Sequence, residues 1–313
     1  MTGSNKLQKI IMQIKEINDY NGLGRAIFIA NSQYELIVTL DVGPRILWFS
    51  VLDGNNMLAD NVQETETLPD GSEWRLYGGH RIWHSPEQFP RTYLSDSHPV
   101  EKYELNDDGI IIHQQTEPGT QIQKSLKIKF ESDCIEIQNQ LTNCSPWPIE
   151  TSVWAITVVP PGGYAVCPVA KTDTGLLPNA CYVTWPYTRL NDDRLHWGEE
   201  YIKIFADAQT KEEFKIGYSN SAGWIAYIKD NDIFIKQYHH TSDSTYPDFG
   251  CSTEIYTSYF GLEMETLSPV GTLAPDETLV HREYWHIQPA PEIKELEEIG
   301  LKERIKKAIS QYQ

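Results

Sequence analysis

One stretch of the chain, residues 77–87 (YGGHRIWHSPE), gathers most of the side-chain types that a ligand site needs. It supplies a phenol, two imidazoles, a guanidinium, an indole and a carboxylate, and its paired glycines let the backbone turn sharply or approach a ligand closely. Pro86 interrupts regular structure, which places Trp83 to Glu87 on or beside a loop. A flat apolar face with convergent donors and acceptors is typical of a site for a polyhydroxylated ligand. The alternative is a structural corner with Trp83 in the core.

A second stretch, residues 261–269 (GLEMETLSP), carries carboxylates at alternate positions. In a β-strand Glu263 and Glu265 project from the same face, about 6–7 Å apart at Cα, while Leu262 and Met264 face the other way. The two charges repel each other, and burial would raise the pKa of at least one of them, which favours a general acid or base working near neutral pH. The alternative is a solvent-facing strand with polar outer positions.

Other catalytic motifs find little support. His80 and His84 have the four-residue spacing of a zinc pair on a helix, but Arg81 stands where the HExxH motif has glutamate, and no third ligand is evident nearby. The sequence has no Gly-x-Ser-x-Gly elbow, no P-loop and no GxGxxG after a strand. We therefore expect no metal, no cofactor and no serine hydrolase.

Composition and charge restrict the classes of binding partner that we expect. The 313 residues carry a formal net charge of −18, which argues against nucleic acid or an anionic membrane as the main partner. Five cysteines without CxxC spacing disfavour a disulfide framework and favour a reducing cytoplasm. Residues 1–16 lack the apolar core of a signal peptide, and no apolar run approaches the ~20 residues of a membrane span. We expect a soluble cytoplasmic monomer or homodimer that binds a small molecule.

Short runs rich in β-branched and aromatic residues recur along the chain and predict β-strands. Polar turns rather than helices separate them, which predicts antiparallel packing in a sandwich or barrel. Residues 52–76 carry turn signals and are expected to be loop. The predicted strands are residues 25–29, 34–40, 45–51, 110–114, 122–130, 134–141, 150–159, 181–185, 201–205, 214–218, 224–228, 234–238, 254–267 and 281–287.

The two ends of the chain follow a different pattern. Apolar residues recur at helical spacing over about 6–18, which predicts a short amphipathic helix. Residues 291–313, after a proline-rich break, combine Glu and Lys with Ile and Leu at near-helical spacing and predict a C-terminal helix. We expect a single all-β domain over residues 1–290, with the C-terminal helix packed on it.

Taken together, these motifs resemble the galactose mutarotase-like (aldose 1-epimerase) superfamily. Residues 42–47 (VGPRIL), the Tyr-Gly-Gly at 77–79 with its His/Arg/Trp continuation, and the closing block 261–285 carry the resemblance, which extends over roughly 20–288. The GGHRIWHSPE form indicates a branch distinct from the galactose enzyme itself. The resemblance implies an antiparallel β-supersandwich with a sugar-sized cleft on its concave face.

In this family a strand-borne glutamate acts as general base on the anomeric hydroxyl, and a histidine protonates the ring oxygen. The glutamate carries over best to Glu263, with Glu265 as the rival. Tyr77 stands where the family has a histidine before Gly-Gly, and a later histidine motif falls on residues 151–155, which contain none. The resemblance therefore implies that an adjacent histidine, His80 or His84, acts as the general acid.

The first hypothesis is thus an aldose 1-epimerase-like isomerase that interconverts the anomers of a sugar or sugar derivative. The second is a non-catalytic carbohydrate-binding or sensing protein on the same scaffold, and the third is a glycoside hydrolase or lyase. For a phosphorylated or acidic sugar, Arg45, Arg81 and Lys236 should converge at the site. The residues expected to bind the sugar are Arg45, Tyr77, Arg81, Trp83, Glu87, Trp154, Lys236, Asp248 and Glu265.

Overall fold

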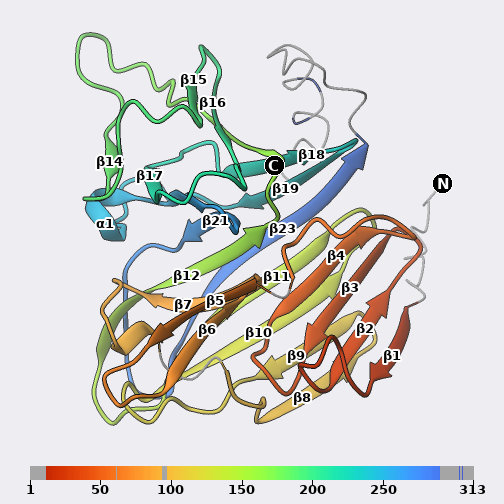
Figure 1. Ribbon diagram of the computed structural model, residues 1–313. Coiled ribbons are helices and arrows are strands. Elements are labelled where there is room, and N and C mark those ends of the chain that lie inside the picture. The colour runs from red at the N-terminus through yellow and green to blue at the C-terminus, as the bar shows by residue number, and fades with distance from the viewer. Residues whose placement is uncertain (1–11, 61, 94–96, 290–302, 304, 306–313) are drawn as a thin grey trace, which may run out of the picture.

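The structure, a computed structural model, describes residues 12–60, 62–93, 97–289, 303 and 305. Within these residues nearly every regular element is a β-strand, and the paired strands run antiparallel (Figure 1). Two large sheets and one two-stranded sheet hold the strands. The predicted antiparallel all-β class is therefore confirmed. No helix among the described residues is long and apolar enough to cross a membrane.

The first sheet has eleven strands, and the two stretches with the most chemistry in the sequence meet near its centre. β7 (Gly79–Ser85) and β21 (Gly261–Leu267) flank β12 (Ile149–Val159) on either side. The remaining strands of this sheet are β1 (Gln13–Ile17), β2 (Ala26–Ala30), β3 (Tyr34–Thr39), β4 (Ile46–Val51), β14 (Tyr182–Thr184), β17 (Phe214–Tyr218), β20 (Thr253–Ser258) and β22 (Gly271–Leu273).

The second sheet has ten strands and faces the first across the apolar core. Its strands are β8 (Lys102–Asn106), β9 (Gly109–His113), β10 (Ile122–Phe130), β11 (Ile135–Asn143), β13 (Tyr164–Pro168), β15 (Leu195–Trp197), β16 (Tyr201–Phe205), β18 (Trp224–Lys229), β19 (Asp232–Tyr238) and β23 (Thr278–Pro289). Two short helical turns complete the structure, η1 (Arg91–Tyr93) and α1 (Pro247–Gly250).

Large aromatic side chains fill the space between the two sheets. Phe49, Phe234 and Trp285 come from β4, β19 and β23 and pack with ring centroids 5.1–5.3 Å apart. All three are buried, and the burial of such apolar surface is the main force that holds the sheets together. In the first sheet, β7, β12 and β21 thus each have one face in this core and the other face turned outward.

A chain of buried polar side chains also crosses the core. Lys236 Nζ lies 3.0 Å from Glu283 and donates a hydrogen bond of 2.8 Å to Thr157 Oγ1. His80 contacts the same hydroxyl through Nδ1 and Asn139 Oδ1 through Nε2, both at 2.8 Å. Because the Asn139 oxygen can only accept, His80 carries its proton on Nε2 and Thr157 donates to Nδ1. Burial lowers the pKa of His80 to about 4, so the imidazole is neutral at neutral pH.

We expect this neutral imidazole to make folding stability fall in acid. The pKa of His80 is about 4 in the folded protein, against 6.5 for an ordinary histidine, so between these values the unfolded chain binds the additional proton. Stability is then lost as the pH falls from 6.5 toward 4, by about 1.4 kcal/mol per pH unit for one such group. Urea unfolding at several pH values should give a shallower slope for His80→Gln than for the wild type. Equal slopes would contradict the prediction.

The predicted N-terminal helix over about 6–18 is wrong where the structure describes that segment. Residues 13–17 form β1, which pairs with β2 at the edge of the first sheet, with Ile14 opposite Ile29. Backbone pairing with an open sheet edge satisfies N–H and C=O groups at alternate residues of β1 and outweighs the helical spacing of the side chains. The part of the predicted helix that precedes Met12 lies outside the described residues.

The predicted C-terminal helix, residues 291–313, also lies outside the described residues except at two positions. Glu303 and Ile305 are helical, and Ile305 is 3% exposed. Its side chain belongs to an apolar cluster with residues of β13, β18 and β19, among them Val166, Trp224 and Ile235. This position of the C-terminal segment therefore packs on the outer face of the second sheet.

Residues 52–76, expected to be loop, contain most of a β-hairpin. β5 (Val62–Thr67) pairs with β6 (Glu73–Tyr77), and Trp74 and Leu76 of β6 pack on the outer face of the first sheet. The segment resembles a loop in sequence because the opposite face of the hairpin is polar, as the exposed pair Thr67 and Glu73 shows. The hairpin gives the first sheet a second layer over β7, β12 and β21 (Figure 1).

Candidate functional site

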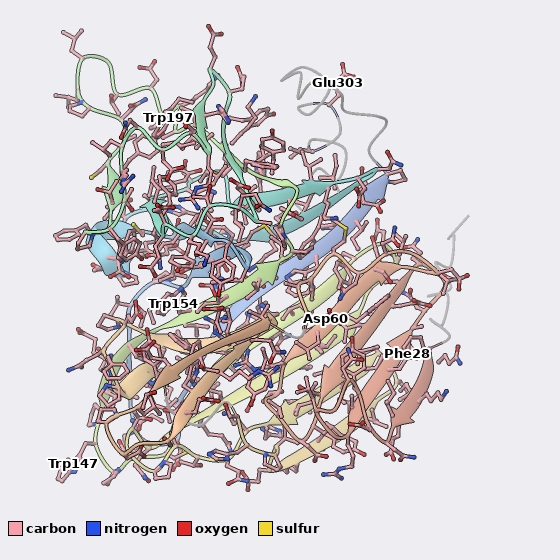
Figure 2. All side chains as sticks on the ribbon, in the orientation of Figure 1. Phe28, Asp60, Trp147, Trp154, Trp197 and Glu303 are labelled. Carbon is pink, nitrogen blue, oxygen red and sulfur yellow. The ribbon has the colours of Figure 1, made fainter. Side chains whose placement is uncertain are left out.

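A cavity of about 330 Å³ lies between the β5–β6 hairpin and the outer face of the first sheet. Its walls combine nine aromatic side chains with five glutamates, one arginine and one lysine. The volume falls within the range of about 300–1,000 Å³ that is typical of ligand pockets. Trp154 of β12 lies at its floor, 4% exposed and in the middle of the molecule, whereas Trp147 projects at the edge (Figure 2).

β7 divides the candidate stretch between two environments. Arg81 and Trp83 project outward into the cavity, whereas His80, Ile82 and His84 project into the space between the sheets. This division follows from the two-residue period of a β-strand. The stretch predicted to lie on or beside a loop therefore runs in a strand as far as Ser85, and only half of its side chains reach the cavity.

The paired glycines before this strand are needed for the chain's own packing. Gly79 has a φ of +64°, and a Cβ at this position would lie 2.1 Å from the carbonyl oxygen of Ile46. Gly78 has a φ of +97°, and a Cβ there would lie 2.4 Å from the carbonyl oxygen of Ala59. The close backbone approach expected from these glycines therefore brings β7 against neighbouring backbone rather than against a ligand.

The structure does not bring the two histidines to the cavity. His80 is 0% exposed within the polar chain of the core, and its ring packs edge-on against Trp285 at 5.0 Å. His84 is 1% exposed, with Nε2 3.3 Å from Glu117, which in turn lies 2.7 Å from Lys124. Burial lowers the pKa of His84 as well. Strand parity places both imidazoles on the far side of β7 from the cavity, so neither lines it.

Glu263 and Glu265 share the outer face of β21, with Leu262 and Met264 in the core. Of the two carboxylates, Glu263 lines the cavity. Its Oε1 lies 3.2 Å from both Nη1 and Nη2 of Arg81, and no described residue hydrogen-bonds its Oε2. Burial raises the pKa of Glu263, and Arg81 opposes that shift without cancelling it.

Glu265 is fully buried behind the cavity wall. Its Oε2 accepts hydrogen bonds from Trp154 Nε1 at 2.6 Å and from Lys215 Nζ at 2.9 Å. Lys215 also lies 2.7 Å from Glu254. Burial acts to lower the pKa of Lys215, but Glu254 and Glu265 raise it, and it remains well above its ordinary value. The ammonium is therefore charged, which leaves Glu265 committed to a structural ion pair.

The two cations of the cavity also hold its indole rings. The Arg81 guanidinium lies 4.8 Å from the ring centroid of Trp83 and 5.8 Å from that of Trp74. Lys215 Nζ lies 4.7 Å from the ring of Trp154 and 4.6 Å from that of Trp185. Cation–π contacts of this kind fix the orientation of an aromatic face. Four indoles are thus positioned by groups that are themselves ion-paired.

Other residues predicted to bind the sugar lie elsewhere. Arg45 is fully buried, donates from Nη1 to the Leu76 carbonyl oxygen at 2.9 Å, and stacks 5.1 Å from the ring of Tyr77. Lys236 lies in the core, and Asp248 lies in α1 with a φ of 50°. None of these lines the cavity, so Arg45 and Lys236 do not converge with Arg81 as an acidic sugar would require. Glu87 does line it, and accepts a hydrogen bond from Tyr93 at 2.6 Å.

Sequence reasoning missed several residues of the cavity wall. Trp74, Trp185, Tyr187 and Tyr256 lie outside both candidate stretches. Only Lys215 carried a usable signal, because it stands between two apolar residues of the predicted strand 214–218 and must face away from the core. The others became site residues only when the sheet and the hairpin were assembled.

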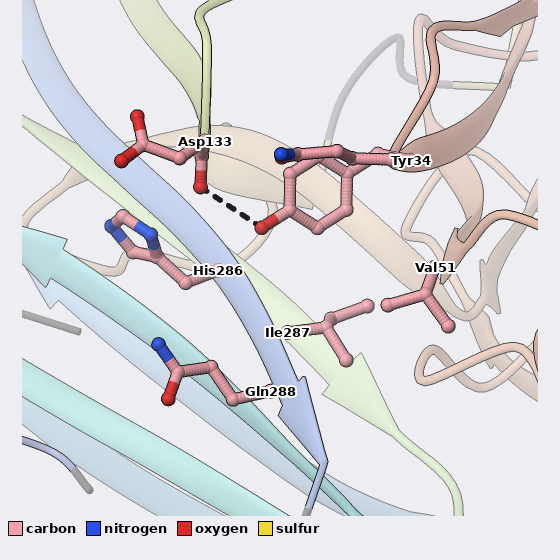
Figure 3. A pocket seen from close by; sticks show the side chains of 7 residues that line it. Tyr34, Val51, Asp133, His286, Ile287 and Gln288 are labelled. Carbon is pink, nitrogen blue, oxygen red and sulfur yellow. Dashed lines mark hydrogen bonds between the residues drawn. The ribbon is translucent and has the colours of Figure 1, made fainter. Parts of the chain in front are cut away.

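A second cavity, of about 380 Å³, lies beside β3 and β23. The Tyr34 hydroxyl donates a 2.9 Å hydrogen bond to the backbone oxygen of Asp133 there, and His286 and Gln288 complete one wall (Figure 3). Among its described lining residues, Tyr34 supplies the one phenyl-type ring. It therefore lacks the stacking surfaces that the cavity under the β5–β6 hairpin offers.

The sequence matches no known family profile and no curated protein. Solved structures do share its architecture. A candidate mutarotase from Salmonella typhimurium superposes with a TM-score of 0.55 over 91% of this chain and 95% of its own, at 11% identity. A candidate aldose 1-epimerase from Klebsiella pneumoniae subsp. pneumoniae gives 0.57 over 90% and 85%, at 10% identity.

The chain has the galactose mutarotase-like fold. A TPR-domain containing protein from Parabacteroides distasonis shares it, with a TM-score of 0.60 over 87% of this chain at 13% identity, although the chain spans only 48% of that longer protein. At such identities the galactose mutarotase-like fold is what the likeness establishes. A fold does not fix an activity, which depends on the residues of the cavity itself.

Proposed function

We propose that this protein binds a small sugar in the cavity under the β5–β6 hairpin and interconverts its anomers, as an aldose 1-epimerase does. The observation that carries the proposal is Glu263, a carboxylate of raised pKa in a cavity walled by aromatic side chains. Aromatic rings pack on the apolar face of a sugar, and carboxylates accept hydrogen bonds from its hydroxyls. The names of the Salmonella and Klebsiella neighbours, mutarotase and aldose 1-epimerase, agree with this chemistry.

Glu263 is the proposed general base. Its Oε2 would take the proton of the anomeric hydroxyl while the bond between the anomeric carbon and the ring oxygen breaks and the ring oxygen gains a proton. The open aldehyde then rotates, and the ring closes on its other face by the reverse transfers. Arg81 holds Oε1 and so fixes the carboxylate, and the raised pKa brings Glu263 closer to the value that suits a base at neutral pH.

We assign the proton donor to Tyr187. The hydroxyls of Tyr93 and Tyr256 are committed to Glu87 and Glu213 at 2.6 and 2.8 Å, whereas Tyr187 lines the cavity and donates to no described residue. Burial raises the pKa of Tyr187 and Lys215 lowers it, with a net increase, so the phenol keeps its proton at neutral pH. It can therefore offer that proton to a ring oxygen.

Tyr187→Phe should slow anomer exchange by about a hundredfold while leaving the apparent Michaelis constant within a few-fold of the wild type. This loss of rate is at the lower end of the roughly 10²–10⁴-fold contribution of a general acid, because Tyr187 is 39% exposed and water can partly replace its hydroxyl. NMR exchange spectroscopy over a range of sugar concentrations separates the two parameters. A rate unaffected by this variant would remove Tyr187 from the mechanism.

The proposed function is tested by NMR exchange spectroscopy with glucose, galactose and their amino, acidic and phosphorylated derivatives. Faster exchange between α and β anomers of one sugar, in proportion to protein concentration, is the expected result. A product of changed mass would indicate a glycoside hydrolase or lyase instead. No perturbation of any sugar would contradict both catalysis and sugar binding.

A second candidate function, sugar binding without turnover, rests on a specific observation. No histidine is present among the described residues that line the cavity, and Glu263 is held in an ion pair with Arg81. A binding or sensing protein needs the aromatic walls but no proton donor. Line broadening of a sugar without faster anomer exchange would favour this function over the first.

A further inference from the structure

We propose that the sugar bound in this cavity carries a positive charge, as an amino sugar with a free amine does. This inference rests on the proposed function and specifies its ligand. It follows from the balance of charge around the cavity, from the aromatic faces beside those charges, and from an indole donor in the wall that has no acceptor of its own.

Both cations that line the cavity are already paired. Arg81 contacts Glu263 at 3.2 Å, and Lys215 contacts Glu254 and Glu265 at 2.7 and 2.9 Å. Each is nearly fully buried, so neither can turn away to meet a ligand. A negatively charged sugar would have to displace one of these buried carboxylates, which is costly because it leaves that carboxylate buried without its partner.

Four further carboxylates line the cavity, and none lies within ion-pair distance of a cation in the described part of the chain. They come from three separate segments, and phenols rather than cations hold three of them. Tyr93 donates to Glu87 at 2.6 Å and Tyr256 to Glu213 at 2.8 Å. The hydroxyl of Tyr259 likewise donates to Glu64, and Lys211 lies 6.0 Å from the Tyr259 ring without reaching that carboxylate. The fourth carboxylate is Glu66.

Phenol donors position a carboxylate without neutralising it. Tyr93, Tyr256 and Tyr259 all have raised pKa values, with burial the main cause for Tyr93 and Tyr256 and the hydrogen bond to Glu64 the main cause for Tyr259. These phenols therefore keep their protons and act as donors to the three carboxylates. The cavity keeps an excess of negative charge beside aromatic faces, which is the combination that binds an ammonium group.

The cavity wall also contains a polar donor without a partner. Trp74 is 9% exposed and lines the cavity, and its indole Nε1 has no hydrogen-bond acceptor among the described residues. A buried N–H without an acceptor costs free energy, and a hydroxyl oxygen of a bound sugar can serve as that acceptor. Trp74 would then bind a hydroxyl of the ligand, and the carboxylates would bind its amine.

The test compares glucosamine with glucose, glucuronic acid and glucose 6-phosphate, by NMR titration at low salt and a pH below that of the amine's own titration. We expect glucosamine to bind about tenfold more tightly than glucose and the two acidic sugars to bind more weakly than either. The preference for glucosamine should fall as the pH rises and its amine loses the proton. In Glu87→Gln/Glu213→Gln the ratio of glucosamine to glucose affinity should fall toward one, whereas Glu104→Gln, on exposed β8, should keep the wild-type ratio.

The outcomes separate this inference from the proposed function. If glucose and glucosamine bind equally, or an acidic sugar binds best, the inference is wrong and sugar binding stands. A preference for glucosamine that persists in Glu87→Gln/Glu213→Gln also contradicts it, because these two carboxylates would then not be the groups that attract the amine. If none of the four sugars binds, the proposed function fails and this inference fails with it.

Discussion

Glu263→Gln should reduce the rate of anomer exchange by about 10²–10⁴-fold. Glutamine has nearly the same shape, and its amide oxygen can still accept the hydrogen bonds of Arg81 that Oε1 accepts at 3.2 Å. It cannot take a proton from the anomeric hydroxyl, so the loss falls on the chemical step. NMR exchange spectroscopy with the sugar that the wild type turns over measures the effect.

Two controls make this result interpretable. Glu104→Gln removes an exposed carboxylate from β8, which belongs to the other sheet and does not line the cavity, and should exchange anomers at the wild-type rate. Thermal unfolding of Glu263→Gln should remain cooperative, with a modest loss of stability because Arg81 keeps its contacts with Trp74 and Trp83 but loses a charged partner. An unchanged exchange rate in Glu263→Gln would exclude Glu263 as the base.

Lys236→Met should lower the free energy of unfolding by about 3–5 kcal/mol at neutral pH. Lys236 and Glu283 are both fully buried and 3.0 Å apart, and the ammonium is the main group that stabilises the Glu283 carboxylate. Burial acts to raise the pKa of Glu283, but Lys236, His80 and His281 together lower it to about 2. Removing the ammonium leaves a charge in the core that must be protonated or hydrated.

Lys236→Met/Glu283→Gln should recover most of that loss, because it removes the unpaired charge together with its partner. Urea unfolding at neutral pH measures both variants. The carboxamide can still accept from Trp285 Nε1, which donates to Glu283 at 2.9 Å. A double variant as unstable as Lys236→Met would show that the cost comes from the lost contacts with Thr157 and Met264 rather than from the charge.

The sequence predicted most of the strands because their side chains alternate or form short β-branched runs. Residues 122–130, 201–205 and 214–218 form strands with the expected bounds. The prediction failed where pairing partners decide the outcome. Residues 254–267, expected as one strand, form β20 and β21 with a turn at residues 259–260 between them, and Gly261, directly after that turn, has a φ of +144°. A Cβ there would lie 2.3 Å from the Val159 oxygen, so the neighbouring strand requires glycine.

The sequence by itself determined the residue types of the site and which of them share a strand face. Glu263 and Glu265 lie on one face of β21 because the period of a strand is two, and the same period separates Arg81 and Trp83 from His80 and His84. Only the tertiary structure decided which face of each strand lies in the core and which face lines the cavity. The second sheet packs on the side that carries the histidines, and the β5–β6 hairpin covers the side that carries Arg81.

Local spacing could not reveal the rest of the cavity wall. Trp74, Trp185, Lys215 and Tyr256 come from four segments spread over much of the chain, and they meet because long-range strand pairing brings those segments together. The choice between the two glutamates was decided in the same way. Lys215 and Trp154 bind Glu265 and leave Glu263 at the cavity, since contacts between distant segments determine which carboxylate remains available to a ligand.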